Sequence, residues 1–288
     1  MMRLPKNPLM FRKVTVVGIG LLGGSLAVAM KKNHLAREVV GVSRRQAALN
    51  YAVKNKIIDH GTSNIVKSVE NADLVILATP IQTILSLLTS LGPHLKRGCI
   101  VTDVGSTKTS IVQAAQKHLP NHVLFVGSHP LAGSEKKGVE FSDANLFAQS
   151  FCLLTPTDKT NKGALERVTE LWTRVGCTTK ALSPDEHDSI LAFTSHIPHL
   201  LAYALMEGIP AEYLTYGAGG LKDMTRIASS SPEVWTDICM QNPKNILKSL
   251  DEIIKVLAVY RKAIASRDEN ALMEGFKRAK EKRDGLSP

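Results

Sequence analysis

One histidine stands where an ionisable side chain could do chemistry. His129 lies in the segment Gly127–Glu135 (sequence GSHPLAGSE), directly after the apolar residues 123–126. The apolar run predicts a buried strand, so His129 is expected at the carboxyl end of that strand. In an open α/β sheet, ligands bind at the carboxyl ends of the strands. Because imidazole titrates near neutral pH, His129 is a candidate proton acceptor.

A second motif, near the start of the chain, predicts a dinucleotide site. Residues 14–17 are typical of a strand and residues 25–29 of a helix, and between them lies the motif Gly18-x-Gly20-Leu21-Leu22-Gly23. The first glycine permits a tight turn, the second lets the backbone approach a pyrophosphate, and the third allows close helix–strand packing. The amides that begin the helix would face the phosphates. Together, the two motifs indicate a dehydrogenase.

The end of the next predicted strand, residues 39–42, indicates which nicotinamide cofactor is used. NAD-selective sites usually carry a carboxylate there, which accepts hydrogen bonds from the ribose 2′-hydroxyl. Here the strand is followed by Ser43, Arg44 and Arg45, whose hydroxyl and guanidinium groups suit a 2′-phosphate. We therefore expect NADP, with NAD as the alternative. The competing interpretation is that the two arginines merely begin a surface helix.

Composition narrows the class of protein. The chain has 288 residues, 44% hydrophobic and 22% charged, as in a globular protein with one larger and one smaller domain. No apolar run approaches the roughly 18 residues that span a bilayer, and the first residues lack a secretory apolar core. Four scattered cysteines indicate reduced thiols. We expect a cytoplasmic protein that binds no membrane.

The net charge of +10 requires an explanation. Basic proteins bind phosphate backbones nonspecifically, but here the basic residues are scattered, apart from the dense run 277–283. That run is typical of a solvated helical face. We expect the charge to attract small anions, such as a phosphorylated cofactor or a dicarboxylate, and no nucleic acid.

Short apolar runs alternate with helix-forming segments over the first 180 residues. The runs are continuous, as expected for strands covered on both faces. The predicted strands are 13–17, 39–42, 74–78, 100–103, 123–126, 151–155 and 177–180. This alternation predicts an α/β fold with a doubly wound, Rossmann-type parallel sheet.

The strand pattern stops near Ser183, where a helix begins with a capping serine, a proline and a glutamate three residues on. Pro232 and Pro243 begin further helices, and in the last one apolar residues recur at helical spacing. Such a domain is small to stand alone. We therefore predict a dinucleotide-binding domain over residues 1–182 and an all-helical substrate-binding and dimerisation domain over 183–288.

Further polar residues follow the predicted strands or lie on the helices of the second domain, where a core would not choose them. Among them are Ser106, His187, His196, His199, Lys222 and Arg226; Thr79, Pro80 and Ile81 also follow a predicted strand, as does Gly105. Arg226 could bind a carboxylate in a bidentate fork, or it could pair with a nearby carboxylate of its own chain. His187 and His196 could equally cap or brace helices. The three histidines lack the spacing of a helical zinc pair, and Pro198 is expected to break their helix, so we expect no metal.

Taken together, these residues resemble the prephenate and arogenate dehydrogenases of tyrosine biosynthesis over residues 18–251. The motifs that carry the resemblance are Gly18-x-Gly20-Leu21-Leu22-Gly23-Gly24-Ser25, Ala78-Thr79-Pro80-Ile81, Asp103-Val104-Gly105-Ser106-x-Lys108, the segment Gly127–Glu135, Ser195-His196-x-Pro198-His199 and Asp223-x-Thr225-Arg226. The resemblance implies NAD(P)-dependent oxidative decarboxylation of a cyclohexadienol. The chain ends without the regulatory or mutase domain that the family often carries, so a monofunctional homodimer is expected.

The resemblance also implies roles for residues. His129 would take the proton of the substrate hydroxyl, with Ser106 as its orienting partner. Arg226 would hold a carboxylate, and the other expected substrate contacts are His199, Lys222, Ser134, Glu135 and His196. Thr79, Pro80, Ile81 and Gly105 would border the nicotinamide. The end of the second strand is similar to the NADP-using arogenate branch, whereas Ser134 and Glu135 are similar to the prephenate branch, so the substrate stays open.

Two other functions compete with this one. A 3-hydroxyacid dehydrogenase or an imine reductase would share the two-domain plan, but these enzymes usually place a catalytic lysine on a helix of the second domain or rely on a hydroxyl. A non-catalytic NADPH-sensing protein would need the glycine motif but neither His129 nor Arg226.

Overall fold

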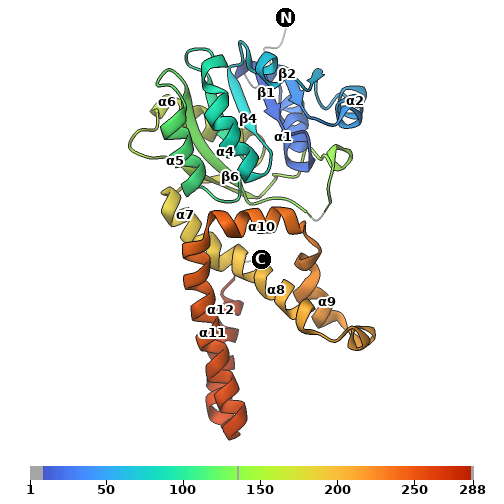
Figure 1. Ribbon diagram of the computed structural model, residues 1–288, viewed down its shortest axis with the longest axis vertical. Coiled ribbons are helices and arrows are strands. Elements are labelled where there is room, and N and C mark those ends of the chain that lie inside the picture. The colour runs from blue at the N-terminus through green and yellow to red at the C-terminus, as the bar shows by residue number, and fades with distance from the viewer. Residues whose placement is uncertain (1–8, 135, 287–288) are drawn as a thin grey trace, which may run out of the picture.

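The computed structural model describes residues 9–134 and 136–286. It shows a sheet domain with a helical arm that projects away from it (Figure 1). The last strand of the sheet ends at Ala181 and the first helix of the arm begins at Pro184.

The sheet domain contains eight strands, and the order across the sheet is β3-β2-β1-β4-β5-β6-β7-β8. Their bounds are Phe11–Val17 (β1), Ala36–Val42 (β2), His60–Thr62 (β3), Leu74–Leu77 (β4), Ile100–Asp103 (β5), Leu124–Pro130 (β6), Phe151–Thr155 (β7) and Thr178–Ala181 (β8). Neighbouring strands are parallel except β6 and β7, which are antiparallel. The doubly wound α/β fold is therefore confirmed, with one reversed strand.

Helices cover both faces of the sheet. They are Leu21–Lys32 (α1), Gln46–Lys54 (α2), Ile65–Val69 (α3), Ile81–Ser90 (α4), Thr109–His118 (α5) and Lys162–Arg174 (α6). Successive residues of β4 divide between two hydrophobic cores: Leu74 and Ile76 belong to one, Val75 and Leu77 to the other. This is the physical reason that the strand sequences are continuously apolar.

Two strands depart most from the prediction, and four others differ from their predicted bounds by one to three residues. β3 was missed because it has only three residues, and His60 and Gly61 are exposed, so no apolar run marks it. β6 extends four residues beyond the predicted end at Val126. Its extension, residues 127–130, pairs with β7 in antiparallel register. His129 therefore lies within the strand, opposite Leu153, rather than after it.

The arm consists of Pro184–Leu191 (α7), Ile197–Gly208 (α8), Gly219–Thr225 (α9), Pro232–Gln241 (α10), Pro243–Ser266 (α11) and Glu269–Asp284 (α12). The predicted start of α7 is confirmed, since Ser183 Oγ accepts a hydrogen bond from the Glu186 amide at 3.2 Å. Pro232 and Pro243 begin α10 and α11 as expected. In Figure 1, α10 lies directly beneath the sheet domain, and α11 and α12 extend away from it.

Pro198 does not break its helix, contrary to expectation. A π-helical turn, Ala192–His196, joins α7 to α8 immediately before the proline. A π turn accommodates one extra residue within a helix, so residues 184–208 form one continuous helix. By length and composition alone this helix could cross a membrane. However, its buried polar residues His187, Asp188 and His196 are packed within the protein.

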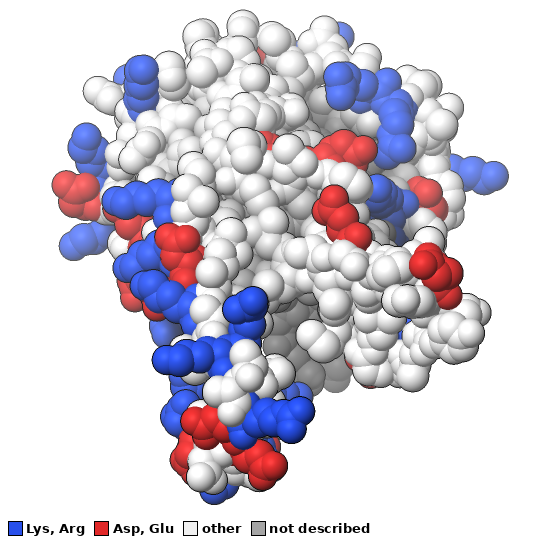
Figure 2. Space-filling model, turned by 60° about the horizontal axis from the view of Figure 1, so that its bottom comes forward, with Lys and Arg blue, Asp and Glu red and all other residues white. Residues whose placement is uncertain are grey.

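The arm has little core of its own. Ala192, Ile197 and Ile246 form its cluster of buried apolar residues. On α11, by contrast, Ile254 and Leu257 are 52% and 54% exposed. Figure 2 shows Lys and Arg side chains mainly along the flank and tip of the arm and around the sheet domain, with a broad uncharged surface between them.

Candidate functional site

A cleft of about 1000 Å³ lies where the carboxyl ends of the strands meet the arm. Twelve of the residues that the sequence predicted for the site line it. They are Gly20, Leu21, Leu22, Thr79, Pro80, Ile81, Gly105, Ser106, His129, Ser134, His199 and Arg226. The imidazole of His129 and the guanidinium of Arg226, which come from different domains, therefore share one cleft.

The glycine motif forms a tight turn between β1 and α1. Gly18 has a φ of +102°, and a Cβ there would lie 2.3 Å from the carbonyl oxygen of Ala78. A Cβ on Gly23 would lie 2.0 Å from the carbonyl oxygen of Gly18. A Cβ on Gly20, in contrast, would meet no protein atom within 4 Å. The motif thus leaves open space at the start of α1, where helix amides favour an anion, and this fits the pyrophosphate of a dinucleotide.

Ser43, Arg44 and Arg45 lie beside this turn but outside the cleft lining. The Gly18 amide donates to the Val42 carbonyl at 2.9 Å, so the two strand ends adjoin. Ser43 Oγ accepts a hydrogen bond from the Arg45 amide at 3.1 Å, and both arginine side chains are exposed. The donor set therefore fits a 2′-phosphate at the rim of the site.

His129 is largely buried in the wall of the cleft. Burial lowers its pKa well below the ordinary value, and the nearby positive charge of Lys108 lowers it further. The imidazole is therefore neutral at neutral pH and can accept a proton.

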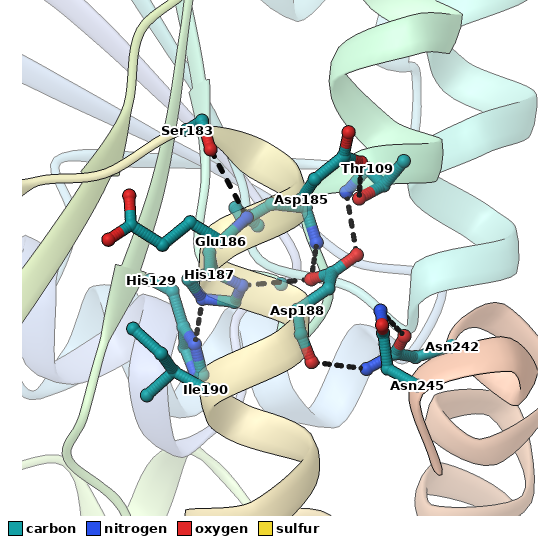
Figure 3. A network of polar contacts seen from close by, with 12 residues as sticks. Thr109, His129, Ser183, Asp185, Glu186, His187, Asp188, Ile190, Asn242 and Asn245 are labelled. Atoms are coloured by element: carbon teal, nitrogen blue, oxygen red, sulfur yellow. Dashed lines mark hydrogen bonds and ion pairs between the residues drawn. The ribbon is translucent and has the colours of Figure 1, made fainter. Parts of the chain in front are cut away.

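A chain of hydrogen bonds runs behind His129 (Figure 3). His129 Nδ1 lies 2.9 Å from His187 Nε2, and His187 Nδ1 lies 2.8 Å from Asp188 Oδ1. Asp188 also accepts hydrogen bonds from the backbone amides of Lys108 and Thr109. The residue that contacts the Nδ1 atom is thus His187 on α7, a partner that the sequence did not predict. Ser106 lines the same cleft, and a catalytic role for it stays a prediction.

The motif around Asp103 is structural at its two charged positions. Asp103 and Lys108 form an ion pair in which both side chains are fully buried. Lys108 Nζ also donates to the Ser128 carbonyl at 2.9 Å. Buried charges are costly unless they are paired and hydrogen-bonded, and these contacts satisfy them. The pair fixes the end of β5 against the residue that precedes His129.

On the arm side of the cleft, an aromatic ring fixes a histidine near Arg226. His199 stacks on Trp235, with ring centroids 3.5 Å apart and planes 21° from parallel. His199 Nδ1 lies 3.0 Å from the Ser195 carbonyl. Burial lowers the pKa of His199, and the positive charge of Arg226 lowers it further. His199 therefore faces the cleft as a neutral imidazole.

Two predicted substrate contacts do not line the cleft. His196 is buried, with 1% of its surface exposed, and its Nδ1 lies 3.3 Å from Asn242 Nδ2. Ser195 and His199 are four residues apart, so they lie on the same face of the helix, and both line the cleft. His196 lies on another face of the helix, towards the interior. Lys222 is exposed on α9, outside this cleft. Glu135 lies outside the described residues.

Some cleft residues were not predicted. Trp235, Lys136 and Lys137 line the cleft. The two lysines directly follow the predicted segment Gly127–Glu135, so their charge was a usable signal. Trp235 gave no such signal, because an aromatic residue on a helix is usually a core residue. Within residues 9–134 and 136–286, no three His, Cys, Asp or Glu side chains group to hold a metal.

Two family models match the chain. The prephenate dehydrogenase nucleotide-binding domain matches residues 26–180, and the prephenate dehydrogenase dimerization domain matches residues 183–278. Among individual proteins, the chain is 38% identical over 280 residues to the prephenate dehydrogenase of Bacillus subtilis, covering 95% of this chain and 76% of that protein. It is 35% identical over 284 residues to the cyclohexadienyl dehydrogenase of Zymomonas mobilis, covering 96% of each.

Solved structures agree with the sequence comparisons. A crystal structure of prephenate dehydrogenase from A. aeolicus, in complex with hydroxyphenyl propionate and NAD+, superposes with a TM-score of 0.90. It is 34% identical to this chain and the alignment covers 98% of this chain and 100% of that one. The likeness therefore extends through both domains.

Proposed function

The chain belongs to the prephenate dehydrogenase family, and we propose that it oxidatively decarboxylates prephenate or arogenate with a nicotinamide cofactor, as an enzyme of tyrosine biosynthesis. One observation supports this most directly: His129, Arg226 and the glycine turn line a single cleft. A cyclohexadienol carries the matching groups, a ring hydroxyl and a ring carboxylate. We therefore discard the hydroxyacid dehydrogenase, imine reductase and cofactor-sensing alternatives.

In the proposed reaction, a bound nicotinamide would supply the acceptor for the hydride that leaves the ring carbon bearing the hydroxyl. His129 takes the hydroxyl proton as the carbonyl forms, which a neutral imidazole can do. Carbon dioxide then leaves the opposite ring carbon, and the ring becomes aromatic. Arg226 binds a substrate carboxylate and so orients the ring. His199, held by Trp235, and Ser134 complete the substrate contacts.

We further propose that NADP is the preferred cofactor. Gly18, Gly20, Gly23 and the start of α1 would hold the pyrophosphate, and Thr79, Pro80, Ile81 and Gly105 would border the nicotinamide. Ser43, Arg44 and Arg45 would bind the 2′-phosphate. The A. aeolicus relative holds NAD+, so the preference must be measured here rather than transferred.

We propose that the enzyme is a cytoplasmic homodimer joined through its arm. Residues 1–182 would form the cofactor domain, and residues 183–288 the substrate and dimer domain. Support for the dimer comes from the exposed apolar side chains of α11 and α12, among them Ile254, Leu257 and Phe276, and from the match to a dimerization domain. A cytoplasmic location fits the four unpaired cysteines.

A four-way assay tests the activity. Prephenate and arogenate are each mixed with NADP and with NAD, and formation of the reduced cofactor is followed by absorbance. We expect turnover with at least one substrate and a higher kcat/KM with NADP than with NAD. No turnover in any of the four mixtures would contradict the proposed function.

A further inference from the structure

The hydrogen bonds behind His129 determine which of its two nitrogens carries the hydrogen. Asp188 is 1% exposed and accepts from the backbone N–H of Lys108 at 2.7 Å and that of Thr109 at 2.9 Å. These donors favour the ionised carboxylate, which can only accept. His187 Nδ1, 2.8 Å from Asp188 Oδ1, must therefore carry a hydrogen and donate it.

The position of the hydrogen on His187 in turn determines the position of the hydrogen on His129. A neutral imidazole has one N–H and one lone pair, so His187 Nε2 can only accept. The atom that faces it at 2.9 Å is Nδ1 of His129. His129 Nδ1 must therefore be the donor, and the lone pair of the neutral ring is on Nε2, the nitrogen left for a ligand in the cleft.

We propose that His187 is the positioning residue of the reaction: it selects the tautomer of His129 whose Nε2 can take the substrate proton, and Asp188 holds His187 in turn. This inference rests on the proposed function. The O–H bond of the substrate breaks as its carbonyl forms and the proton binds to Nε2 of His129; a bound nicotinamide would supply the acceptor for the hydride that leaves the same carbon. His129, now a cation, still donates Nδ1–H to His187.

If the hydrogens of His187 and His129 were on the other ring nitrogens, His129 could not act as the base. If His187 carried its hydrogen on Nε2, that N–H would point at His129 Nδ1, which would then have to accept. His129 would place its own hydrogen on Nε2 and meet the substrate hydroxyl with a donor. Since His187 and Asp188 lie on α7 and His129 lies on β6, the correct tautomer also requires the arm to be docked on the sheet domain.

Nitrogen NMR on the wild-type protein tests the assignment without relying on turnover. The nine histidines are labelled with ¹⁵N, and spectra are recorded at pH 8, where His129 and His187, whose pKa values burial lowers, are neutral. Signals of His129 and His187 are identified from variants in which each is replaced. We expect both rings to carry hydrogen on Nδ1 and a lone pair on Nε2. A hydrogen on Nε2 of His129 would overturn the proposal.

Two substitutions of His187 test the consequence for catalysis. In His187→Gln, the amide oxygen can occupy the place of Nε2 and accept from His129, whereas His187→Leu has similar bulk but no acceptor. We expect His187→Leu to lower kcat by about 10- to 100-fold, as when the hydrogen-bond partner of a metal-binding histidine is removed, and to shift His129 towards hydrogen on Nε2. His187→Gln should keep the tautomer and most of the kcat.

The exposed neighbour Glu186→Gln, on the same helix, is the matched control and should behave as wild type. Equal kcat values for His187→Gln and His187→Leu would overturn the positioning role. Wild-type protein that shows the expected tautomer but turns over neither substrate would instead contradict the proposed function, so the two failures are distinguishable.

Discussion

The two walls of the cleft are built differently. On the sheet side, the glycine turn and His129 are supported by strands that are covered by helices on both faces. On the arm side, Arg226 and His199 stand on helices whose shared buried cluster is small and whose outer face is apolar and exposed. The sheet wall is therefore expected to be stable within one chain, whereas the arm wall is expected to depend on a second copy.

The largest expected effect concerns the sheet wall. His129→Asn should lower kcat by about a thousandfold, because general base catalysis typically contributes 10²–10⁴-fold. Affinity for NADP should stay near that of wild type, because the glycine turn is untouched. Steady-state kinetics and calorimetric titration with NADP measure the two quantities. Near-normal kcat would exclude His129 as the proton acceptor.

The corresponding change on the arm wall should affect binding more than chemistry. Arg226→Ala should raise KM by about 10- to 100-fold, since a hydrogen bond to a charged group contributes about 1.5–3 kcal/mol. Initial rates over a range of substrate concentrations give KM and kcat separately. An unchanged KM would remove Arg226 from the substrate site.

Acid should weaken the junction through His196. Burial lowers the pKa of His196 from 6.5 to about 4. Above pH 6.5 the ring is neutral in both folded and unfolded states. Between pH 6.5 and about 4 only the unfolded chain takes up the proton, so stability falls by up to about 3 kcal/mol as the pH falls. Denaturant unfolding at several pH values should show a shallower loss for His196→Asn.

Identical slopes for His196→Asn and wild type would show that another group causes the acid sensitivity.

Dependence of the arm on a second copy can be tested on α11. Ile254→Glu places a charge on the exposed apolar face and should weaken self-association by about tenfold or more, because burying an unpaired charge is costly. Sedimentation over a concentration range measures the dissociation constant. Lys248→Glu, a charge change at a polar position of α11, should leave it nearly unchanged. If the wild-type protein is monomeric, the arm wall does not depend on a second copy.

The smallest expected effect concerns cofactor choice. Ser43→Asp puts a carboxylate where the 2′-phosphate is proposed to bind, so it should lower the NADP-to-NAD ratio of kcat/KM by about tenfold through repulsion of like charges. The ratio is measured with both cofactors at a fixed substrate concentration. If it does not move, Ser43 does not face the 2′ position.

Sequence predicts the sheet wall better than the arm wall, and the reason is physical. A parallel strand is marked by a continuous apolar run, and the glycine motif by steric limits that only glycine satisfies. The sequence did not predict β3 or the last four residues of β6, because no continuous apolar run marks these segments. The partner of His129 is 58 residues away in the sequence, and no local pattern indicates which side chains meet across a domain junction.

The direction in which each side chain leaves the helix explains why His196, predicted as a substrate contact, does not line the cleft. The spacing of His196 and His199 allows either to face the cleft, and the outcome depends on how α7 and α8 are joined. For Lys222, sequence proximity to Arg226 suggested a shared site, but α9 presents it to solvent.

The π turn before Pro198 makes the number of residues in this helix matter as well as their identity. Each residue rotates an α-helix by about 100°, so deleting one residue from Ala192–His196 would turn everything downstream by that angle relative to α7. His199 would leave Trp235 while His187 stayed in place. Lineages of this enzyme should thus keep the length of this turn as strictly as its buried side chains Ala192 and His196.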